Sequence, residues 1–394
     1  MGGGSRVDKK GTAPQAWWGR RVDAMLLSLV ALLALPEEQQ TLAAESEASE
    51  RKTYPTWDLA LNVTYPLLAV NTADLYQDSV ARVVKAAVGV GIYNVDFHMG
   101  EEALGVGKAI ESLGRDALFL TTKLDKPDPL ITNPVVARDL AYSQIEGVLS
   151  DIGNYSVDML ILKDSPSCPV MQAQWAVLEE YLSKGKAKVL GTYNFCEFSL
   201  DCILMNASVG KEPKVNYLMR HVGMGPDATG IIAYSLSKGI KTAAYGTLGE
   251  PVALNELLMD RTMRDIAEKN NRSVEEVALK WNAQAGHAIT TRITSDYAPD
   301  YAPGTPCSHP WGASSVRAGL TDDCKASIDA MTDVYDWDLD DEDVNQLDLL
   351  EFNTYPQSPT YYSSTGCPAS YSVVKHPNMS ACAAFKPRYA STWC

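Results

Sequence analysis

The chain has 394 residues, of which 46% are hydrophobic and 21% are charged, and this composition excludes a disordered chain, a collagen and a coiled coil. Acidic residues number 49 against 34 lysines and arginines, so the net charge is −15. Because nucleic-acid backbones bind clustered cations, this balance argues against nucleic acid as the main partner. The five histidines have no metal-ligand spacing, and we therefore expect no zinc site.

Residues 1–44 are predicted to be a secretory signal. Basic residues, including Arg20 and Arg21, precede an apolar run over 24–35, and small residues follow it. A helix over this run would be about 18 Å long, whereas a bilayer core is about 30 Å thick. The alternative is a signal-anchor that attaches the chain to a membrane through residues 24–35. Residues 45–55 are expected to form a linker between this leader and the fold.

Cysteines and glycosylation sequons also favour the secretory route, and hence a lumenal or extracellular location. The chain has eight cysteines and no CxxC motif, so disulfides are plausible, although eight cysteines allow about 105 pairings. Five Asn-X-Ser/Thr sequons add to this expectation. The sequons begin at Asn62, Asn154, Asn206, Asn271 and Asn378.

Eight short apolar runs alternate with amphipathic helical patterns along the chain. Near-continuous apolar runs are typical of parallel strands that are buried on both faces. The runs cover 66–71, 92–97, 117–124, 156–164, 187–194, 214–221, 241–246 and 288–293. Eight strand–helix units predict an α/β fold, a (β/α)₈ TIM barrel within residues 56–352. A doubly wound open sheet is the alternative, and it is less favoured because no GxGxxG follows the first run.

Two segments do not fit this repeat. Residues 296–325 are rich in Pro, Gly and Ser and are expected to form a long loop after the eighth strand. Residues 353–394 form a Cys-rich tail with too little periodic apolar surface to fold alone. We expect disulfides from Cys367, Cys382 and Cys394 to hold this tail across the barrel mouth.

Polar residues gather where the predicted strands end. The carboxyl ends of neighbouring strands meet at one face of a barrel, so Asp96, Lys123 and Lys163 are expected to converge there. One lysine can pair with Asp96, and repulsion and desolvation should then lower the pKa of the other. A plain salt bridge with a solvated second lysine is the alternative.

Several segments resemble the aldo-keto reductase family, in the family's order, over about residues 58–350. They include GIYNVDFHMGEEALGVGKAI (91–110), LFLTTKL (118–124), VDMLILKDSPS (157–167), WAVLEEYLSKGKAKVLGTYNF (175–195), AAYGTLGE (243–250), SVEEVALKW (273–281) and WDLDDEDVNQLDLL (337–350). The resemblance implies a TIM barrel that reduces aldehydes and ketones with NAD(P)H.

The resemblance implies a catalytic set of Asp, Tyr, Lys and His, of which this chain matches only two. Asp96 and Lys123 match. Lys163 stands at the histidine position, and the tyrosine position is occupied by GEE (100–102), where the chain also has a one-residue deletion. Carbonyl reduction needs a proton donor, so the donor must differ here. His98 and Lys163 are the first candidates, and Tyr193 and Tyr217 are further ones.

The same resemblance implies a partly retained cofactor site. Tyr245 matches the tyrosine that stacks on the nicotinamide, and Asn194 matches the asparagine that holds the carboxamide. Tyr193 replaces the family serine, Tyr217 replaces a glutamine, and Arg292 could contact a 2′-phosphate. The expected ligand is NADP, with NAD not excluded. The expected cofactor-binding residues are Thr72, Asn194, Tyr217, Tyr245 and Arg292.

Three functions are therefore expected, and they are given in descending order of preference. The first is an NAD(P)H-dependent oxidoreductase that acts on a small aldehyde or ketone with an altered proton donor. The second is a non-catalytic binding protein of the secretory pathway, since two of the four catalytic residues are replaced. The third is a Schiff-base lyase that uses Lys123 and Lys163, because a neighbouring ammonium group makes a lysine more nucleophilic.

Overall fold

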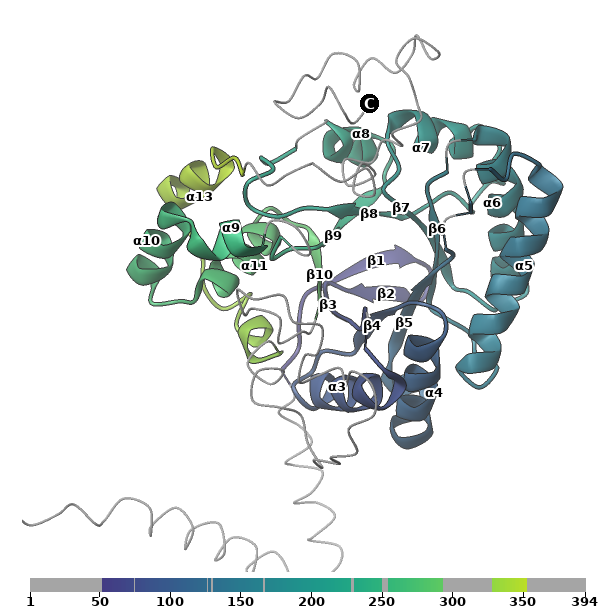
Figure 1. Ribbon diagram of the computed structural model, residues 1–394, viewed down its shortest axis with the longest axis horizontal. Coiled ribbons are helices and arrows are strands. Elements are labelled where there is room, and N and C mark those ends of the chain that lie inside the picture. Colours follow the sequence, from purple (N-terminus) through teal and green to yellow (C-terminus); the bar gives the residue numbers. More distant parts are fainter. Residues whose placement is uncertain are drawn as a thin grey trace, which may run out of the picture. The chain divides into compact units, whose positions relative to one another are not determined.

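The structure is a computed structural model that describes residues 52–73, 75–125, 127–128, 130–165, 167–227, 230–249, 254–292 and 328–352. Eight parallel strands close into a barrel in the order β10-β3-β4-β5-β6-β7-β8-β9 (Figure 1). The barrel strands are β3 (Leu68–Asn71), β4 (Asn94–Phe97), β5 (Phe119–Lys123), β6 (Met159–Lys163), β7 (Val189–Tyr193), β8 (Val215–Met219), β9 (Lys241–Tyr245) and β10 (Ala288–Arg292). Each predicted run contains one of these strands, which confirms the (β/α)₈ barrel and excludes the open sheet.

Helices surround the barrel on its outer side (Figure 1). They are α3 (Gln77–Gly89), α4 (Glu101–Leu113), α5 (Pro134–Asp151), α6 (Cys168–Ser183), α7 (Glu197–Leu204), α8 (Ile231–Ser237), α9 (Leu254–Met259), α10 (Arg261–Asn270), α11 (Val274–Gln284) and α13 (Asp341–Asp348), with a short 3₁₀ turn, η2 (Arg115–Ala117). Their apolar sides pack on the strands. In α3, for example, Val80, Val83 and Val84 are fully buried, and burying each such side chain contributes about 1.5–3 kcal/mol.

Residues typical of helix ends flank two of these helices. Ser273 caps α11 and forms a capping box with Glu276: each side chain accepts a hydrogen bond from the other residue's backbone N–H. Gly185, which follows α6, has a φ of 69°, the left-handed conformation that favours glycine after a helix.

An antiparallel hairpin, which the sequence patterns did not predict, precedes the barrel. It consists of β1 (Thr56–Ala60) and β2 (Val63–Pro66). Tyr65 of β2 is buried in the barrel interior with Phe119 and Val189, which lie at the amino ends of their strands. The hairpin therefore fills the amino end of the barrel and leaves the carboxyl end as the face for chemistry.

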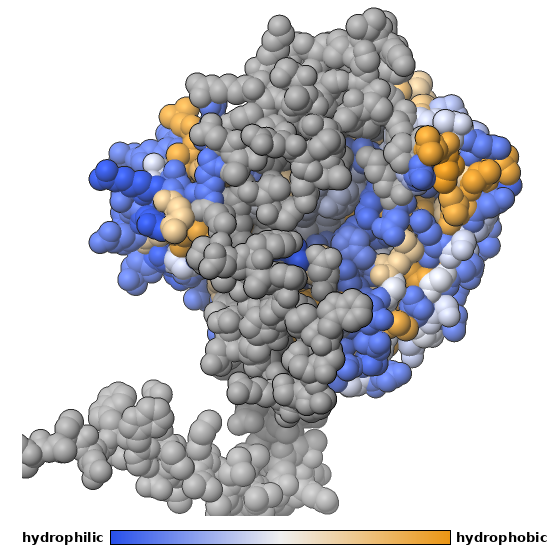
Figure 2. Space-filling model, viewed as in Figure 1, coloured by the Kyte–Doolittle hydropathy of each residue, from blue (hydrophilic) through white to orange (hydrophobic). Residues whose placement is uncertain are grey.

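A disulfide joins Cys168, at the start of α6, to Cys202 in α7, and Cys196 is buried with its Sγ atom 3.7 Å from Oγ of Ser199. The leader at 1–44, the loop at 296–325 and the Cys-rich tail at 353–394 lie outside the described residues, and their predicted roles stay predictions. Among the described helices, none is long and apolar enough to cross a bilayer. On the face shown in Figure 2, hydrophobic residues gather mainly where α5 and α6 lie.

Candidate active site

The residues at the carboxyl ends of the barrel strands form a polar cluster in the barrel interior. Alternate residues of a strand face the same side, so Asp96 of β4, Lys123 of β5 and Lys163 of β6 all point inward with the apolar interior residues below them. Asp96 and Lys123 are almost completely buried, and Lys163 is partly exposed. The strand ends thus bring the predicted residues to one place.

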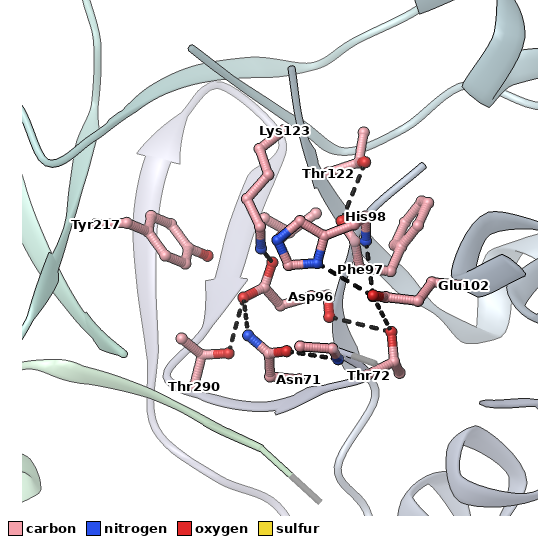
Figure 3. A network of polar contacts seen from close by, with 12 residues as sticks. Asn71, Thr72, Asp96, Phe97, His98, Glu102, Thr122, Lys123, Tyr217 and Thr290 are labelled. Atoms are coloured by element: carbon pink, nitrogen blue, oxygen red, sulfur yellow. Dashed lines mark hydrogen bonds and ion pairs between the residues drawn. The ribbon is translucent and has the colours of Figure 1, made fainter. Parts of the chain in front are cut away.

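Asp96 and Lys123 form a buried ion pair at the centre of this cluster (Figure 3). The second carboxylate oxygen of Asp96 accepts hydrogen bonds from Nδ2 of Asn71 at 2.9 Å and Oγ1 of Thr290 at 3.0 Å. A buried ion pair is tolerated when additional hydrogen bonds satisfy its charges. These contacts fix the Lys123 ammonium group beneath the barrel mouth.

His98 lies beside this ion pair and is oriented by Glu102 (Figure 3). The Oε2 atom of Glu102 is 3.2 Å from Nδ1 of His98, and it also accepts from the His98 backbone N–H at 2.9 Å and from the Thr72 hydroxyl at 2.9 Å. Glu102 belongs to the first turn of α4, where the helix dipole favours a carboxylate. The Nε2 atom of His98 is the ring nitrogen that Glu102 leaves unengaged.

The electrostatics of this pair follow from burial and charge. Burial opposes ionisation of Glu102, but the hydrogen bonds from His98 outweigh it, and the pKa of Glu102 falls to about 2. For His98, burial and the positive charge of Lys123 lower the pKa below its ordinary value, although Glu102 acts in the opposite direction. A His98 imidazolium is therefore a stronger acid than an imidazolium in water.

Lys163 does not pair with Asp96 and is therefore the second lysine of the expected cluster. Its ammonium group instead forms an ion pair with Asp125, at 2.9 Å, in the segment after β5. Burial lowers the pKa of Lys163 despite Asp125, and the charge of Lys123 adds to this effect. The pKa shift has the direction expected for the second lysine, but the partner is a residue that was not anticipated.

Three tyrosine rings lie next to one another in the barrel interior. Tyr193 and Tyr245 are stacked with their ring centroids 4.5 Å apart, and the Tyr217 ring is 6.4 Å from that of Tyr193. Tyr217 is fully buried, and its hydroxyl is 2.6 Å from that of Tyr65 in the hairpin. Burial raises the pKa values of Tyr193 and Tyr217 well above their usual range, which makes both weaker acids than His98.

The other predicted cofactor residues occupy different parts of the site. The side-chain amide of Asn194 donates to the Tyr245 hydroxyl at 2.8 Å, so these two residues are brought together. Thr72 contacts Glu102 and supports the His98 pair. Arg292 is the last residue of β10, and the chain directly after it lies outside the described residues. The expectation that it contacts a 2′-phosphate stays a prediction.

Sequence reasoning missed four residues that shape the site. Asn71 and Thr290 were not singled out, although both lie near strand ends and contact Asp96. Asp125 and Glu102 were also not assigned roles. Glu102 follows His98 by four residues, a spacing that could have identified it had a helix start been placed there.

Comparison with known proteins gives the family of this chain. The profile of the Aldo/keto reductase family matches residues 69–350. An aldo-keto reductase of Mycobacterium leprae is 29% identical over 251 residues, which are 62% of this chain and 83% of that protein. A glyoxal reductase of Bacillus subtilis is 23% identical over 68% of this chain and 82% of its own length.

Solved structures agree on the fold. An aldo/keto reductase from Brucella melitensis has a TM-score of 0.59 at 23% identity, over 75% of this chain and 99% of that one. An aldose reductase from Schistosoma japonicum has a TM-score of 0.58 at 17% identity, and the match covers 77% of this chain and 93% of that one. The chain, a TIM barrel with a polar cluster at its carboxyl end, thus belongs to the aldo/keto reductase family.

Proposed function

We propose that this protein reduces a small aldehyde or ketone with NAD(P)H and that His98 is its proton donor. The observation that carries the proposal is the His98–Glu102 pair beside the Asp96–Lys123 ion pair. Family membership supports the reaction class, and several relatives are named as reductases. The donor is new to the family pattern because the expected tyrosine is absent.

The residues of the site support the two requirements of carbonyl reduction. NAD(P)H, when bound, supplies the hydride, and the protein must supply a proton to the carbonyl oxygen. The His98 imidazolium would give its Nε2 proton to that oxygen and become neutral. Its Nδ1–H would continue to donate to Glu102, and this hydrogen bond keeps the ring in place. The side chain of His98 is 28% exposed, so solvent can return the proton. Lys123 adds positive charge where the oxygen becomes negative.

The residues present fit a nicotinamide ring on Tyr245. A flat ring already stacks on this side chain, namely that of Tyr193, with 22° between the ring planes. Asn194 places an amide next to the Tyr245 hydroxyl, and an amide can pair with a carboxamide. Tyr245 and Asn194 would therefore hold the nicotinamide once Tyr193 has moved aside.

The proposal is tested by NADPH titration and by reduction of a panel of aldehydes, 2-oxo aldehydes and ketones. Purified protein should bind NADPH and oxidise it only when a carbonyl compound is present. H98Q should lower kcat by about 100-fold, the scale of general acid catalysis, with little change in the Kd for NADPH. E102Q should lower kcat less, and E111Q, which changes an exposed glutamate near the other end of α4, should leave it unchanged. Equal rates in H98Q and the wild type would refute the role of His98.

The three-tyrosine stack favours a second candidate, a barrel that binds a ligand without catalysis. The Tyr193 ring fills the space on Tyr245 in this structure. This function would be supported if the protein bound neither NADPH nor NADH at millimolar concentration. The Schiff-base lyase is not favoured, because both lysine ammonium groups are held in ion pairs.

We also propose that the protein enters the secretory pathway. Four of the five sequon asparagines lie in the described part of the chain, and all four are exposed, so an oligosaccharide could be attached without unfolding. The Cys168–Cys202 disulfide is consistent with an oxidising compartment. Whether residues 24–35 are cleaved or attach the chain to a membrane is decided by sequencing the amino terminus of the mature protein.

A further inference from the structure

We propose that Tyr193 is a built-in competitor for the nicotinamide: its ring occupies the stacking position on Tyr245 and limits the affinity for the cofactor. This inference rests on the proposed function, and it names a residue that sets how tightly the cofactor is held. The resemblance places a serine at this position, which has no ring to stack. The substitution therefore adds a contact that a cofactor must displace.

The geometry of the stack carries the inference. The Tyr193 and Tyr245 ring centroids are 4.5 Å apart, at the short end of the range for stacked aromatic rings. The planes are 22° apart, so the two rings are nearly parallel. A nicotinamide on the same face of Tyr245 would need this space, and the two rings cannot occupy it together.

The neighbours of Tyr193 make the stack the preferred state of the empty site. The Tyr217 ring lies 6.4 Å from the Tyr193 ring with 19° between the planes, and its contact with Tyr65 fixes it in the core. The Lys123 ammonium group lies 5.8 Å from the Tyr193 ring centroid, within the range of a cation–π contact. Tyr193 is only partly buried, unlike Tyr217, so its side chain can turn toward the carboxyl end of the barrel.

The affinity of three variants for NADPH tests this inference. An aromatic stack corresponds to about a two- to tenfold change in affinity, so Y193S should bind NADPH about two to ten times more tightly than the wild type. Y193A, a second truncation, should behave in the same way. Y193F keeps the ring and loses only the hydroxyl, so its Kd should stay within about twofold of the wild-type value. Kd is measured by quenching of tryptophan fluorescence and by equilibrium dialysis, and thermal unfolding verifies that each variant folds.

The outcomes separate this inference from the proposed function. Wild-type protein that binds and oxidises NADPH, together with unchanged or weaker binding in Y193S and Y193A, overturns the inference and leaves the function in place. Tighter binding in Y193F as well would assign the effect to the hydroxyl and would also overturn it. If neither the wild type nor any variant binds NADPH or NADH, the proposed function fails together with the inference.

Discussion

A single carboxylate oxygen of Glu102 fixes the orientation of His98, because Oε2 contacts both Nδ1 of the ring and the backbone N–H of the same residue. The Thr72 hydroxyl donates to this oxygen as well. Three contacts on one atom hold the imidazole at a defined angle and leave its other ring nitrogen, Nε2, outside the contact with Glu102. The first prediction follows from this arrangement.

We expect the reductase activity to rise as the pH falls from neutral. Burial and the charge of Lys123 lower the pKa of His98. At pH 7 the neutral imidazole therefore predominates, and the population of the imidazolium form increases at lower pH. A plot of kcat against pH should rise toward acid and level off below the lowered pKa. In E102Q the supporting negative charge is lost, and the rise should move to lower pH. A flat profile in the wild type would contradict His98 as the donor.

Buried histidines predict that stability also depends on pH. Burial lowers the pKa of His221 to about 4 and that of His287 to about 3, whereas an unfolded histidine titrates near 6.5. The unfolded chain therefore binds more protons below pH 6.5, and the free energy of unfolding falls as the pH drops from 6.5 toward 4. For His221 alone the loss is on the order of 3 kcal/mol.

Chemical unfolding at pH 7.5, 6.0 and 4.5 measures this effect. H221Q removes one titrating group, so its free energy of unfolding should change less between pH 7.5 and 4.5 than that of the wild type. Equal slopes for the two proteins would show that His221 does not contribute. The comparison uses differences within each protein, so a lower overall stability of H221Q does not affect it.

The fold was predictable because the barrel repeats a strong local signal. The run at 156–164, for example, contains β6, whose first four residues are buried, and such runs are short and almost wholly apolar. The β1–β2 hairpin was missed because its first strand is mostly exposed or half-buried and carries no apolar run. Tyr65 fills the end of the barrel through long-range packing, which a local pattern does not record.

The site was predictable only in part because ion pairing depends on side chains far apart in the chain. Strand ends placed Asp96 and Lys123 together, and they are in contact. The same rule placed Lys163 beside them, but the ammonium group of Lys163 forms its ion pair with Asp125, from the loop after β5. Loop conformation is not encoded in hydrophobic periodicity, so this competitor could not be anticipated. Glu102 was missed for a related reason, since its role depends on where α4 begins.

Glycosylation of the exposed sequons tests the secretory location. We expect enzymatic deglycosylation to increase the gel mobility of protein expressed in a eukaryotic secretory host. Asn62 lies in the turn between β1 and β2 with a φ of 59°, and Asn206 follows α7, so both are accessible to the transferase. N62Q and N206Q should each remove one increment of the shift. Unshifted protein in the cytosol, with all eight cysteines as free thiols, would contradict the secretory route and the disulfides of the tail.

The stacking role of Tyr245 can be separated from its hydrogen bond. Y245A removes the ring, and we expect it to weaken NADPH binding by roughly 1 kcal/mol or more, about fivefold in Kd, the scale of an aromatic stack. Y245F keeps the ring but loses the hydroxyl that contacts Asn194, so its Kd should lie closer to the wild-type value. The same affinity in Y245A and the wild type would place the nicotinamide elsewhere.

The Asp96–Lys123 pair predicts a large and non-additive effect on stability. K123M leaves the Asp96 carboxylate buried with only the hydrogen bonds from Asn71 and Thr290, and an unpaired buried charge costs about 3–5 kcal/mol. The double variant K123M/D96N removes the charge as well, and it should regain a substantial part of this loss. Urea unfolding of the wild type, both single variants and the double variant gives the coupling energy, which should exceed about 1 kcal/mol because the two groups are in contact. Additive losses would show that Asp96 is stabilised by its neutral donors alone. If K123M retains its fold, its kcat should also be lowered, since the positive charge beside His98 and the carbonyl oxygen has been removed.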